Sequence, residues 1–276
     1  MAEPFRPGLY PGVPDVVYHR DPALSSSGAR KLAMSSPKEF RDERLRGRED
    51  KSEFDFGHLA HKYVLGEGAD VEICDFPNWR SNAAQEAQDD ARAAGRIPAL
   101  PKEDEAAREM ARIVLEHSVA GPLLAEGEAE LSGWWEDSET GVQLKFRTDW
   151  MTRINGRLWV PDYKTSKYSG RRGFAKAAGE FGYYMQQPFY TDGIEALGLD
   201  DDPIFVFISQ CKTPPYVVSV CDIEPADIDL GRALNRHAIR QYAQAQASGE
   251  WTDNTNQIDR VTLPAWVRYQ AEEILG

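Results

Sequence analysis

The stretch Asp149-Trp-Met-Thr-Arg-Ile-Asn155-Gly156-Arg-Leu-Trp-Val-Pro-Asp162-Tyr-Lys164 predicts a β-hairpin with charged side chains on one face. An Asn-Gly pair between alternating polar and apolar residues is the strongest short-range hairpin pattern, because both loop positions need a positive φ. A two-residue loop makes cross-strand partners of positions whose numbers add to 311, and Asp149 and Asp162 meet that condition. Lys164 shares the face of Asp162, because side chains alternate along a strand.

Two opposed aspartates on a hairpin suggest a cation site. Directly opposed Cβ atoms lie roughly 4.5–5.5 Å apart, and like charges there are destabilising. Such a pair is tolerated if one carboxylate is protonated or a cation lies between them. Two carboxylates and an ammonium on one face suit a divalent metal and a phosphodiester. A solvated charged face, with Arg147 opposite Lys164 in a salt-bridge lattice, remains the alternative, although Trp150 and Trp159 make both faces partly apolar.

Composition predicts a soluble globular chain. Its 276 residues, 41% hydrophobic and 28% charged, suffice for one large domain or two. No apolar run approaches the roughly 18 residues that span a bilayer, and the N-terminus lacks a hydrophobic signal core, so we expect a cytoplasmic location and no membrane partner. Three scattered cysteines, Cys74, Cys211 and Cys221, argue against disulfides and against four-cysteine zinc or iron–sulfur sites.

The charge is unevenly distributed along the chain. The net charge of −13 argues against non-specific binding of nucleic acid. Residues 141–180, however, hold nine Lys and Arg against three Asp and Glu, a local surplus of six positive charges around the predicted hairpin. This local surplus favours a polyanionic substrate, with a solvated basic hairpin as the alternative.

Periodicity predicts an α/β fold with a helical N-terminal part. We expect an extended arm at 1–22 and a single domain at 23–276, divided into a helical part (23–126), a core (127–222) and C-terminal helices (223–276). The expected helices are two short ones beginning near Ser25 and Ser36, then 52–66, 82–95, 102–119, 180–197, 225–247 and 264–275. The expected strands are 128–136, 142–154, 157–163, 203–210 and 216–221.

Other polar residues fall near the hairpin. If residues 137–140 form a four-residue loop, Glu130 opposes Arg147 and lies on the face of Asp149, where it could form a salt bridge or contact a metal. His58 and His61 lie one helical turn apart, and neutral imidazole is a good metal ligand. Their spacing alone does not choose between them.

A polar and aromatic pattern marks the helix expected at 180–197. Gln186 and Tyr190 are four residues apart and share a helix face with Tyr183. Amide and phenol groups can hold a phosphate or a ligating carboxylate, and aromatic rings can stack on bases. The alternative is an aromatic stripe that faces the core. Pro188 in the same run predicts a bend.

Together these residues resemble the PD-(D/E)XK nuclease superfamily, and most of all its exonuclease VIII-like (RecE-type) branch of phages and prophages. The resemblance covers residues from about 10 to 225. It rests on Gly57-x-x-x-His61, Arg147-x-Asp149, Pro161-Asp162-Tyr163-Lys164-Thr165, Gln186-x-x-x-Tyr190, Leu24-Ser25-x-Ser27 with Ser36-Pro37, and Trp79-Arg80. It implies an α/β fold with a central mixed sheet flanked by helices. The four-cysteine pattern of the iron–sulfur subgroup is absent.

The resemblance also implies roles for these residues. It selects His61 over His58, and it makes Asp149, Asp162 and the Tyr163 carbonyl ligands of one or two Mg²⁺ ions, for which Mn²⁺ could substitute. Lys164 would orient a water or stabilise the oxyanion, with Glu130 near the metal site. Gln186 and Tyr190 would position the scissile strand. The basic residues expected to hold DNA are Arg147, Lys167, Arg171, Arg172 and Lys176.

At the level of function the resemblance implies an exonuclease that digests double-stranded DNA from its ends, 5′→3′. It further implies a ring-like homo-oligomer that works with a single-strand annealing protein. If the gene is carried by a phage, the protein would act in the cytoplasm of the bacterial host. The alternatives are an endonuclease or nickase, a catalytically silent DNA-binding protein, and a structural or replication-accessory protein.

Overall fold

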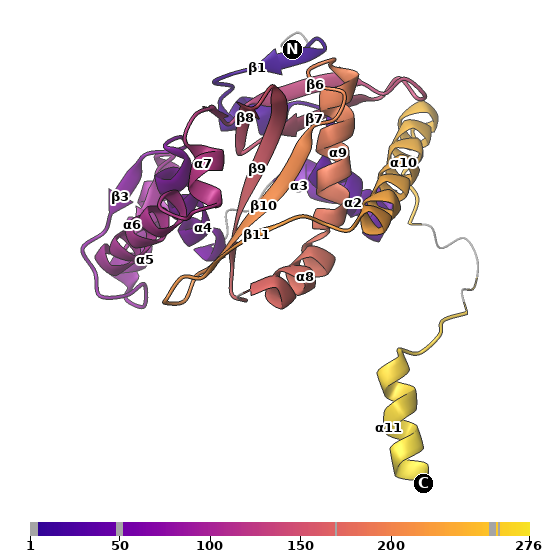
Figure 1. Ribbon diagram of the computed structural model, residues 1–276. Coiled ribbons are helices and arrows are strands. Elements are labelled where there is room, and N and C mark those ends of the chain that lie inside the picture. The colour runs from indigo at the N-terminus through magenta and orange to yellow at the C-terminus, as the bar shows by residue number, and fades with distance from the viewer. Residues whose placement is uncertain (1–4, 48–51, 169, 254–257, 259) are drawn as a thin grey trace.

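The computed structural model describes residues 5–47, 52–168, 170–253, 258 and 260–276 (Figure 1). Its helices are α1 (Asp15–Arg20), α2 (Ser26–Met34), α3 (Pro37–Arg46), α4 (Ser52–Leu65), α5 (Asn82–Ala93), α6 (Pro101–Leu115), α7 (Ala120–Leu124), α8 (Gly170–Phe181), α9 (Tyr183–Ala196), α10 (Pro225–Ser248) and α11 (Ala265–Leu275). Its strands are β1 (Gly8–Tyr10), β2 (Leu24–Ser25), β3 (Val71–Ile73), β4 (Ile97–Ala99), β5 (Glu128–Ala129), β6 (Ser132–Glu136), β7 (Gln143–Arg147), β8 (Trp150–Ile154), β9 (Arg157–Ser166), β10 (Ile204–Cys211) and β11 (Val218–Cys221).

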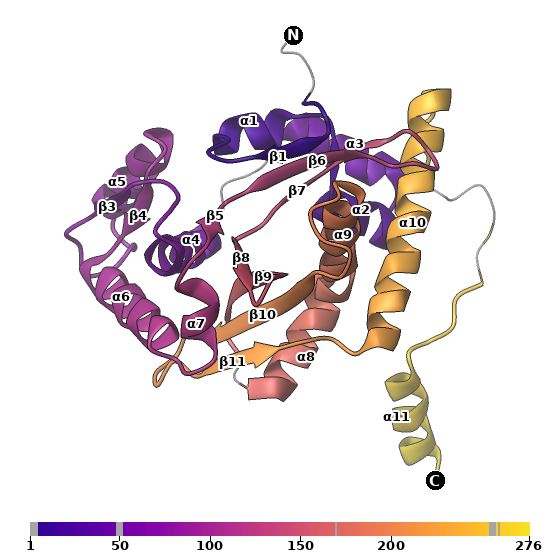
Figure 2. The same cartoon turned by 45° about the horizontal axis from the view of Figure 1, so that its top comes forward.

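Two sheets form the centre of the fold, and helices flank them (Figures 1 and 2). The larger sheet has the order β11-β10-β9-β8-β5, the second has the order β1-β6-β7-β2, and β3 pairs with β4 in a small third sheet. Strands β9 and β10 run parallel and are joined through α8 and α9, while β8–β9 and β10–β11 are antiparallel. The predicted α/β fold with a mixed sheet and flanking helices is therefore confirmed.

The central hairpin has the predicted register. Thr152 pairs with Trp159 and Ile154 with Arg157, and both sums are 311. The loop residues Asn155 and Gly156 adopt φ of 53° and 83°, as the Asn-Gly pattern requires. The regular ladder ends at Thr152 and Trp159, so Asp149 approaches β9 beyond the last paired residues.

The strands expected at 128–136 and 142–154 are each broken in two, which corrects the sequence prediction. Glu130 has a φ of 54° and separates β5 from β6, while Thr148 and Asp149 separate β7 from β8. The two breaks lie side by side, because the Glu130 N–H donates to the Asp149 carbonyl at 3.2 Å. The chain thus passes from one sheet to the other at the level of Asp149.

The loop of the β6–β7 hairpin is longer than predicted. Its last pair is Glu136 with Gln143, so Ser132 and not Glu130 lies opposite Arg147. The error is two residues, which preserves the face of each side chain, since the strand period is two. The expected opposition of Glu130 and Arg147 is therefore wrong, because Glu130 lies before β6 at the break between β5 and β6.

Each face of the larger sheet has its own core. Val160, Phe205 and Phe207 pack with residues of α8 and α9 on one face. Tyr163 and Ile208 pack with residues of α4, α6 and α7 on the other. Asp162 and Lys164 alternate with Tyr163 and therefore lie on the α9 side of the sheet.

Several short elements were not predicted. The expected extended arm contains β1, which pairs with β6, and the short helix α1. Helix α8 begins at Gly170 in a stretch whose two glycines, Gly170 and Gly173, weaken the helical pattern, and Gly182 (φ 70°) separates it from α9. Among the described helices, none has the length and apolar character that would allow it to cross a membrane.

Candidate active site

Strand β9 carries the most buried carboxylate of the site. Asp162 is 1% exposed, and its Oδ1 accepts a hydrogen bond from Nε2 of Gln186 on α9 at 2.7 Å. The Lys164 ammonium forms an ion pair with Oδ2 of Asp162 and lies 5.4 Å from the centre of the Tyr183 ring. Apart from Lys164, no donor among the described residues reaches the buried Oδ2. This oxygen keeps a lone pair for another partner.

Asp149 lies at the break between β7 and β8. Its Oδ2 accepts the Tyr163 backbone N–H at 2.8 Å, so the side chain takes the place of a ladder partner beside β9. The same oxygen lies 3.3 Å from Nε2 of His61. The strand break, and not regular pairing, thus brings Asp149 to β9, where its charge acts on Asp162.

His61 reaches the site from α4. Its Nδ1 lies 2.9 Å from the Gly57 carbonyl, one helical turn earlier. A donor role for Nδ1 leaves the Nε2 lone pair of a neutral ring for a metal, an arrangement common among metal-bound histidines. A Cβ at Gly57 would lie 3.6 Å from Oγ1 of Thr165, an ordinary van der Waals contact, so this turn of α4 lies close to β9. His58 is exposed, and the site contains His61.

The charged side chains of the site shift one another's pKa values. Burial raises the pKa of Asp162 to about 6, with Lys164 opposing this rise and Asp149 adding to it. Burial also acts to raise the pKa of Asp149, but His61 and Lys164 outweigh it and hold that pKa below its usual value. For Lys164, burial acts to lower the pKa, and the two carboxylates overcome it and raise the pKa above its ordinary value.

Glu130 lies beside this group. Its Oε2 is 3.6 Å from Nη1 of Arg147, so the salt bridge allowed by the sequence is present. Burial, followed by repulsion from Asp149, raises the pKa of Glu130 to about 7. Glu130 is therefore close enough to Asp149 to respond to its charge, and a metal contact stays a prediction.

Tyr163 and Tyr190 contribute from the two cores. The Tyr163 hydroxyl donates to Oε1 of Gln210 at 2.6 Å on the far face of the sheet, so only its backbone adjoins Asp149. The Tyr190 ring stacks on Phe146 at 5.4 Å, as the core alternative expected. Burial raises the pKa of Tyr190 well above its usual value, and a hydrogen bond with Gln186 opposes that rise. Tyr190 can therefore support the amide that holds Asp162.

The predicted DNA-binding residues divide into two groups. Arg147 is held by the N-terminal segment: Nη2 donates to the Val13 carbonyl at 2.6 Å, Nη1 pairs with Asp15, and the guanidinium lies 4.4 Å from the centre of the Tyr18 ring. Sequence reasoning missed these partners, because no spacing rule relates residues about 130 positions apart. Four exposed cations remain along and before α8, namely Lys167, Arg171, Arg172 and Lys176.

The donor set fits a hard divalent cation, although it is not assembled as a cage. Within the described residues, no three His, Cys, Asp or Glu side chains are grouped as a ready metal site. Instead, Lys164 pairs with the carboxylate of Asp162 and His61 with that of Asp149. Oxygen ligands with one imidazole suit Mg²⁺ or Mn²⁺. The buried Oδ2 of Asp162, whose one partner among the described residues is Lys164, supports this fit, with His61 and Asp149 as the other ligands.

An aspartate–lysine pair on one strand, met by a second aspartate at the end of its neighbour within a mixed sheet, defines the PDDEXK-like class of domains. The chain belongs to the family of PDDEXK-like domains of unknown function (DUF3799), which matches residues 25–264. A solved structure from Eubacterium rectale, described as a "putative exonuclease", is similar in fold, with a TM-score of 0.57 and 12% sequence identity over 89% of this chain and 92% of that one. No curated protein matches the sequence significantly.

Proposed function

We propose that this chain is a Mg²⁺-dependent exodeoxyribonuclease that degrades linear double-stranded DNA from its ends, 5′→3′, to produce single strands for recombination of the phage (RecE) type. The observation that carries the proposal is the buried Asp162, flanked by Lys164 and close to Asp149 and His61. The nuclease fold supports it. Mn²⁺ can take the place of Mg²⁺ in this proposal.

Each residue then has a task that its contacts support. Asp149, Asp162 and His61, with the Tyr163 carbonyl, would hold the metal, which when bound supplies an activated water and charge neutralisation. Lys164 would hold the attacking water or the developing oxyanion, because its raised pKa keeps it protonated. Gln186 fixes the orientation of Asp162 through its 2.7 Å hydrogen bond, and Tyr190 supports Gln186.

The DNA strand would lie along α8. Of the nine cations in residues 141–180, Lys145 is buried, while Arg153 and Arg157 form ion pairs with Asp200 and Asp202. The exposed cations that remain are those on and before α8. In this proposal they hold the phosphates, whereas Arg147 stabilises the N-terminal segment beside the site and acts on DNA only indirectly.

The wider setting belongs to the same proposal. A ring of identical chains would place the basic α8 region inward and the acidic surplus outward, which reconciles DNA binding with the net charge of −13. A single-strand annealing protein would receive the product strand in the host cytoplasm.

A single assay tests the activity. Linear duplex labelled at the 5′ or the 3′ end is incubated with the protein, with and without Mg²⁺, and release of acid-soluble nucleotides is followed. We expect early release of the 5′ label only with Mg²⁺, and a loss of at least about a hundredfold in Asp149→Asn, whose altered residue has the same shape.

Other outcomes separate the alternatives. Cutting of closed circular DNA would identify an endonuclease or nickase. DNA binding without nucleotide release in either metal would identify a silent DNA-binding protein. Equal activity in Asp149→Asn would remove this site from the reaction.

A further inference from the structure

Phe181, the last residue of α8, is exposed although it lies on the buried face of its helix. Phe174, Ala177 and Ala178 are buried and precede it by seven, four and three residues, so they share its face. Phe181 itself is 46% exposed, and no other described aromatic side chain of residues 5–253 is exposed to this extent. Its ring therefore lies on the side of α8 that faces the sheet, and the described part of the chain leaves it uncovered.

A row of aromatic rings connects Phe181 with the site. Phe181 stacks on Tyr183, with ring centres 6.0 Å apart and ring planes inclined by 29°. Tyr183 is half-buried and also stacks on Phe207 at 5.4 Å, and its ring centre lies 5.4 Å from the Lys164 ammonium. The Phe181 ring centre is therefore at most 11.4 Å from that ammonium, which is 6.0 Å plus 5.4 Å. Within this row, Phe181 is the ring that a ligand can reach.

The backbone that carries the Phe181 ring is held in place. Nη1 of Arg30 on α2 donates to the Phe181 carbonyl at 2.8 Å. Gly182 has a φ of 70°, and a Cβ there would lie 2.5 Å from Cδ of Arg30, so both the turn and the neighbour favour glycine. The guanidinium also offsets the partial negative charge at the end of α8, which would repel a phosphate. The ring is thus presented in one position, so binding costs it little conformational freedom.

A flat apolar ring near a phosphodiester site is suited to the face of a nucleobase. Every base has such a face, so stacking on an aromatic side chain requires no particular sequence. Within a duplex, neighbouring pairs cover both faces of each base, so the ring can stack only on a base at an open or separated end. Asp162 is buried, and one strand reaches such a recessed carboxylate more easily than a paired duplex does.

We propose that Phe181 forms a base-binding subsite, in which its free face stacks on an unpaired base of the strand being cut. Nucleotides follow one another at about 3.4 Å along a strand, so the stacked base lies within roughly three nucleotides of the scissile phosphate. The proposal rests on the proposed nuclease function for the entry of a DNA strand at this site. It adds that the end of the duplex opens before cutting, and that stacking on Phe181 offsets part of the cost of unpairing.

Abasic substrates test the stacking through the initial rate of nucleotide release. Linear duplexes carry one abasic nucleotide at the first, second or third position of the strand being cut, or far from the end. For the wild type we expect a loss of about tenfold at one of the three terminal positions and none at the distant one. Phe181→Ala should lose a similar factor on intact DNA and nothing further on abasic DNA, because the ring and the base act as a pair.

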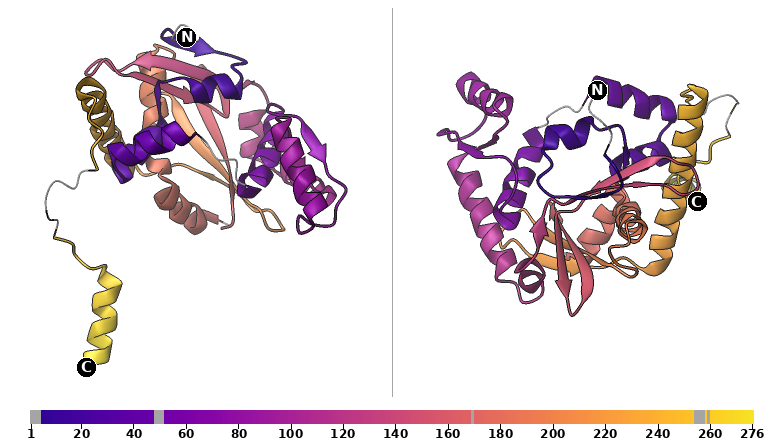
Figure 3. Two further views of the ribbon diagram at one scale, coloured as in Figure 1. Left: turned by 180° about the vertical axis from the view of Figure 1, so that it is seen from behind. Right: turned by 90° about the horizontal axis from the view of Figure 1, so that it is seen from above.

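Three further variants separate stacking from a structural role. Phe181→Trp keeps a ring and should keep the dependence on the base, whereas Phe181→Leu keeps the apolar bulk and should lose that dependence. Tyr269→Ala removes an exposed ring from α11, which all views show apart from the body of the molecule, and should behave as the wild type (Figures 1, 2 and 3). Thermal melting of each variant establishes that it is folded.

Binding without metal distinguishes this proposal from the proposed function. Fluorescence anisotropy in EDTA gives the affinity for single strands with and without the abasic nucleotide. Base-dependent binding that disappears in Phe181→Ala, without nucleotide release by the wild type, would support the subsite and remove the nuclease function. Release at equal rates from intact and abasic ends by the wild type would overturn the subsite and leave the nuclease function in place. An equal abasic loss in Phe181→Ala and the wild type would overturn it as well.

Discussion

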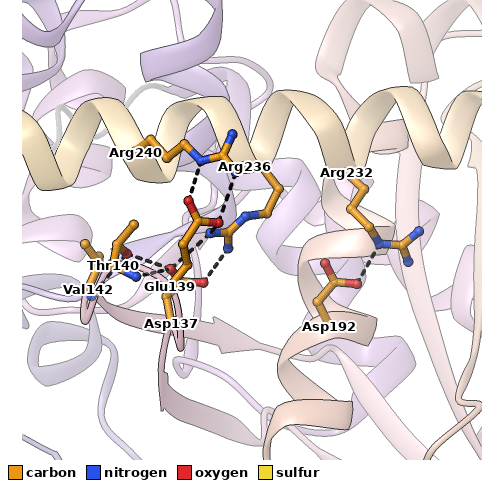
Figure 4. A network of polar contacts seen from close by, with 8 residues as sticks. All are labelled: Asp137, Glu139, Thr140, Val142, Asp192, Arg232, Arg236 and Arg240. Carbon is orange, nitrogen blue, oxygen red and sulfur yellow. Dashed lines mark hydrogen bonds and ion pairs between the residues drawn. The ribbon is translucent and has the colours of Figure 1, made fainter.

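Asp137 and Asp162 are both buried carboxylates, 7% and 1% exposed, yet the chain treats them in opposite ways. Asp137 lies in the loop of the β6–β7 hairpin and meets α10 (Figure 4). Arg236 binds both of its oxygens, and the backbone and hydroxyl of Thr140 donate to Oδ2 at 3.0 and 2.6 Å. Burial acts to raise its pKa, but these donors outweigh burial and lower it.

Asp162 has the deeper position and the poorer set of partners. One oxygen accepts the Gln186 amide, and the other has Lys164 as its one partner among the described residues, whereas Asp137 has four donor contacts. Its pKa is raised to about 6. A carboxylate whose partners are complete stabilises the fold, whereas one that is buried and left incomplete is suited to a ligand from outside the chain. The comparison therefore separates a structural aspartate from a functional one.

The largest expected effect that tests this separation is on activity. Asp162→Asn should lower Mg²⁺-dependent nucleotide release by about a thousandfold or more, equivalent to about 4 kcal/mol, because the amide cannot supply the ligating charge. Its melting temperature should fall only slightly, because the cost of burying a carboxylate with a raised pKa is removed while Lys164 loses one of its two carboxylate partners and keeps Asp149. Single-turnover hydrolysis and thermal melting measure the two quantities. Activity within tenfold of the wild type would contradict a functional role for Asp162.

The next effect is on stability. Asp137→Asn should lower the free energy of unfolding by about 2–3 kcal/mol, because Arg236 loses the more buried of its two charged partners and keeps only Glu139. Activity should stay within a factor of about two, since Asp137 and Arg236 do not contact the site. Denaturant unfolding gives the first value.

Asp192→Asn is the matched control for this change. Asp192 on α9 pairs at 2.9 Å with Arg232, which lies on α10 as Arg236 does. Both side chains are more exposed than those of Asp137 and Arg236. The loss should be below about 1 kcal/mol, as for other exposed pairs. Equal losses in the two variants would show that burial does not distinguish them.

A smaller effect should appear in the pH dependence without metal. Folded Asp162 keeps its proton up to pH about 6, whereas an unfolded aspartate releases it near pH ~4. Between these values the folded state binds more protons, so the free energy of unfolding falls as pH rises, by on the order of 2 kcal/mol. In Asp162→Asn this fall should be smaller by that amount, and the part that remains comes from Glu130, whose pKa is raised to about 7.

The pKa of Asp137 is lowered, so the sign for this residue is opposite. Its contribution is fully present above the unfolded pKa and is lost as pH falls through the folded value. The deficit of Asp137→Asn should therefore be constant from pH 5 to 7 and shrink in stronger acid. Parallel curves for the two variants between pH 5 and 7 would contradict both assignments.

Local patterns explain why so much of this site could be predicted. The Asn155-Gly156 turn fixes the hairpin register through backbone sterics alone, and alternation then places Lys164 beside Asp162. The family resemblance was needed to choose His61 over His58 and to give Gln186 a role, because helical spacing gives each residue a face but no partner. The contacts of both residues with the aspartates depend on the packing of α4 and α9 against the sheet.

The sequence predictions that were wrong also have physical causes. The alternation of residues along a strand does not predict where the strand breaks. Glutamate rarely adopts a positive φ, so the break at Glu130, where the chain crosses from one sheet to the other, could not be predicted. The six residues of the β6–β7 loop include Asp137 and Glu139. Both pair with Arg236, which lies about a hundred positions away on α10. Long-range ion pairs of this kind leave no trace in local spacing.

The smallest expected effect extends the comparison to cations. Arg236 is occupied by acids of its own chain, whereas Arg172 is exposed on α8. Arg172→Gln should weaken duplex binding severalfold, below about 1 kcal/mol, and lower the slope of log affinity against log salt by about one, because one phosphate contact is lost. Arg112→Gln is the control, since Arg112 on α6 is exposed but already paired with Glu109 and Glu116. If the two variants shift the salt slope equally, the cations of α8 are not the ones offered to DNA, and the strand follows another path.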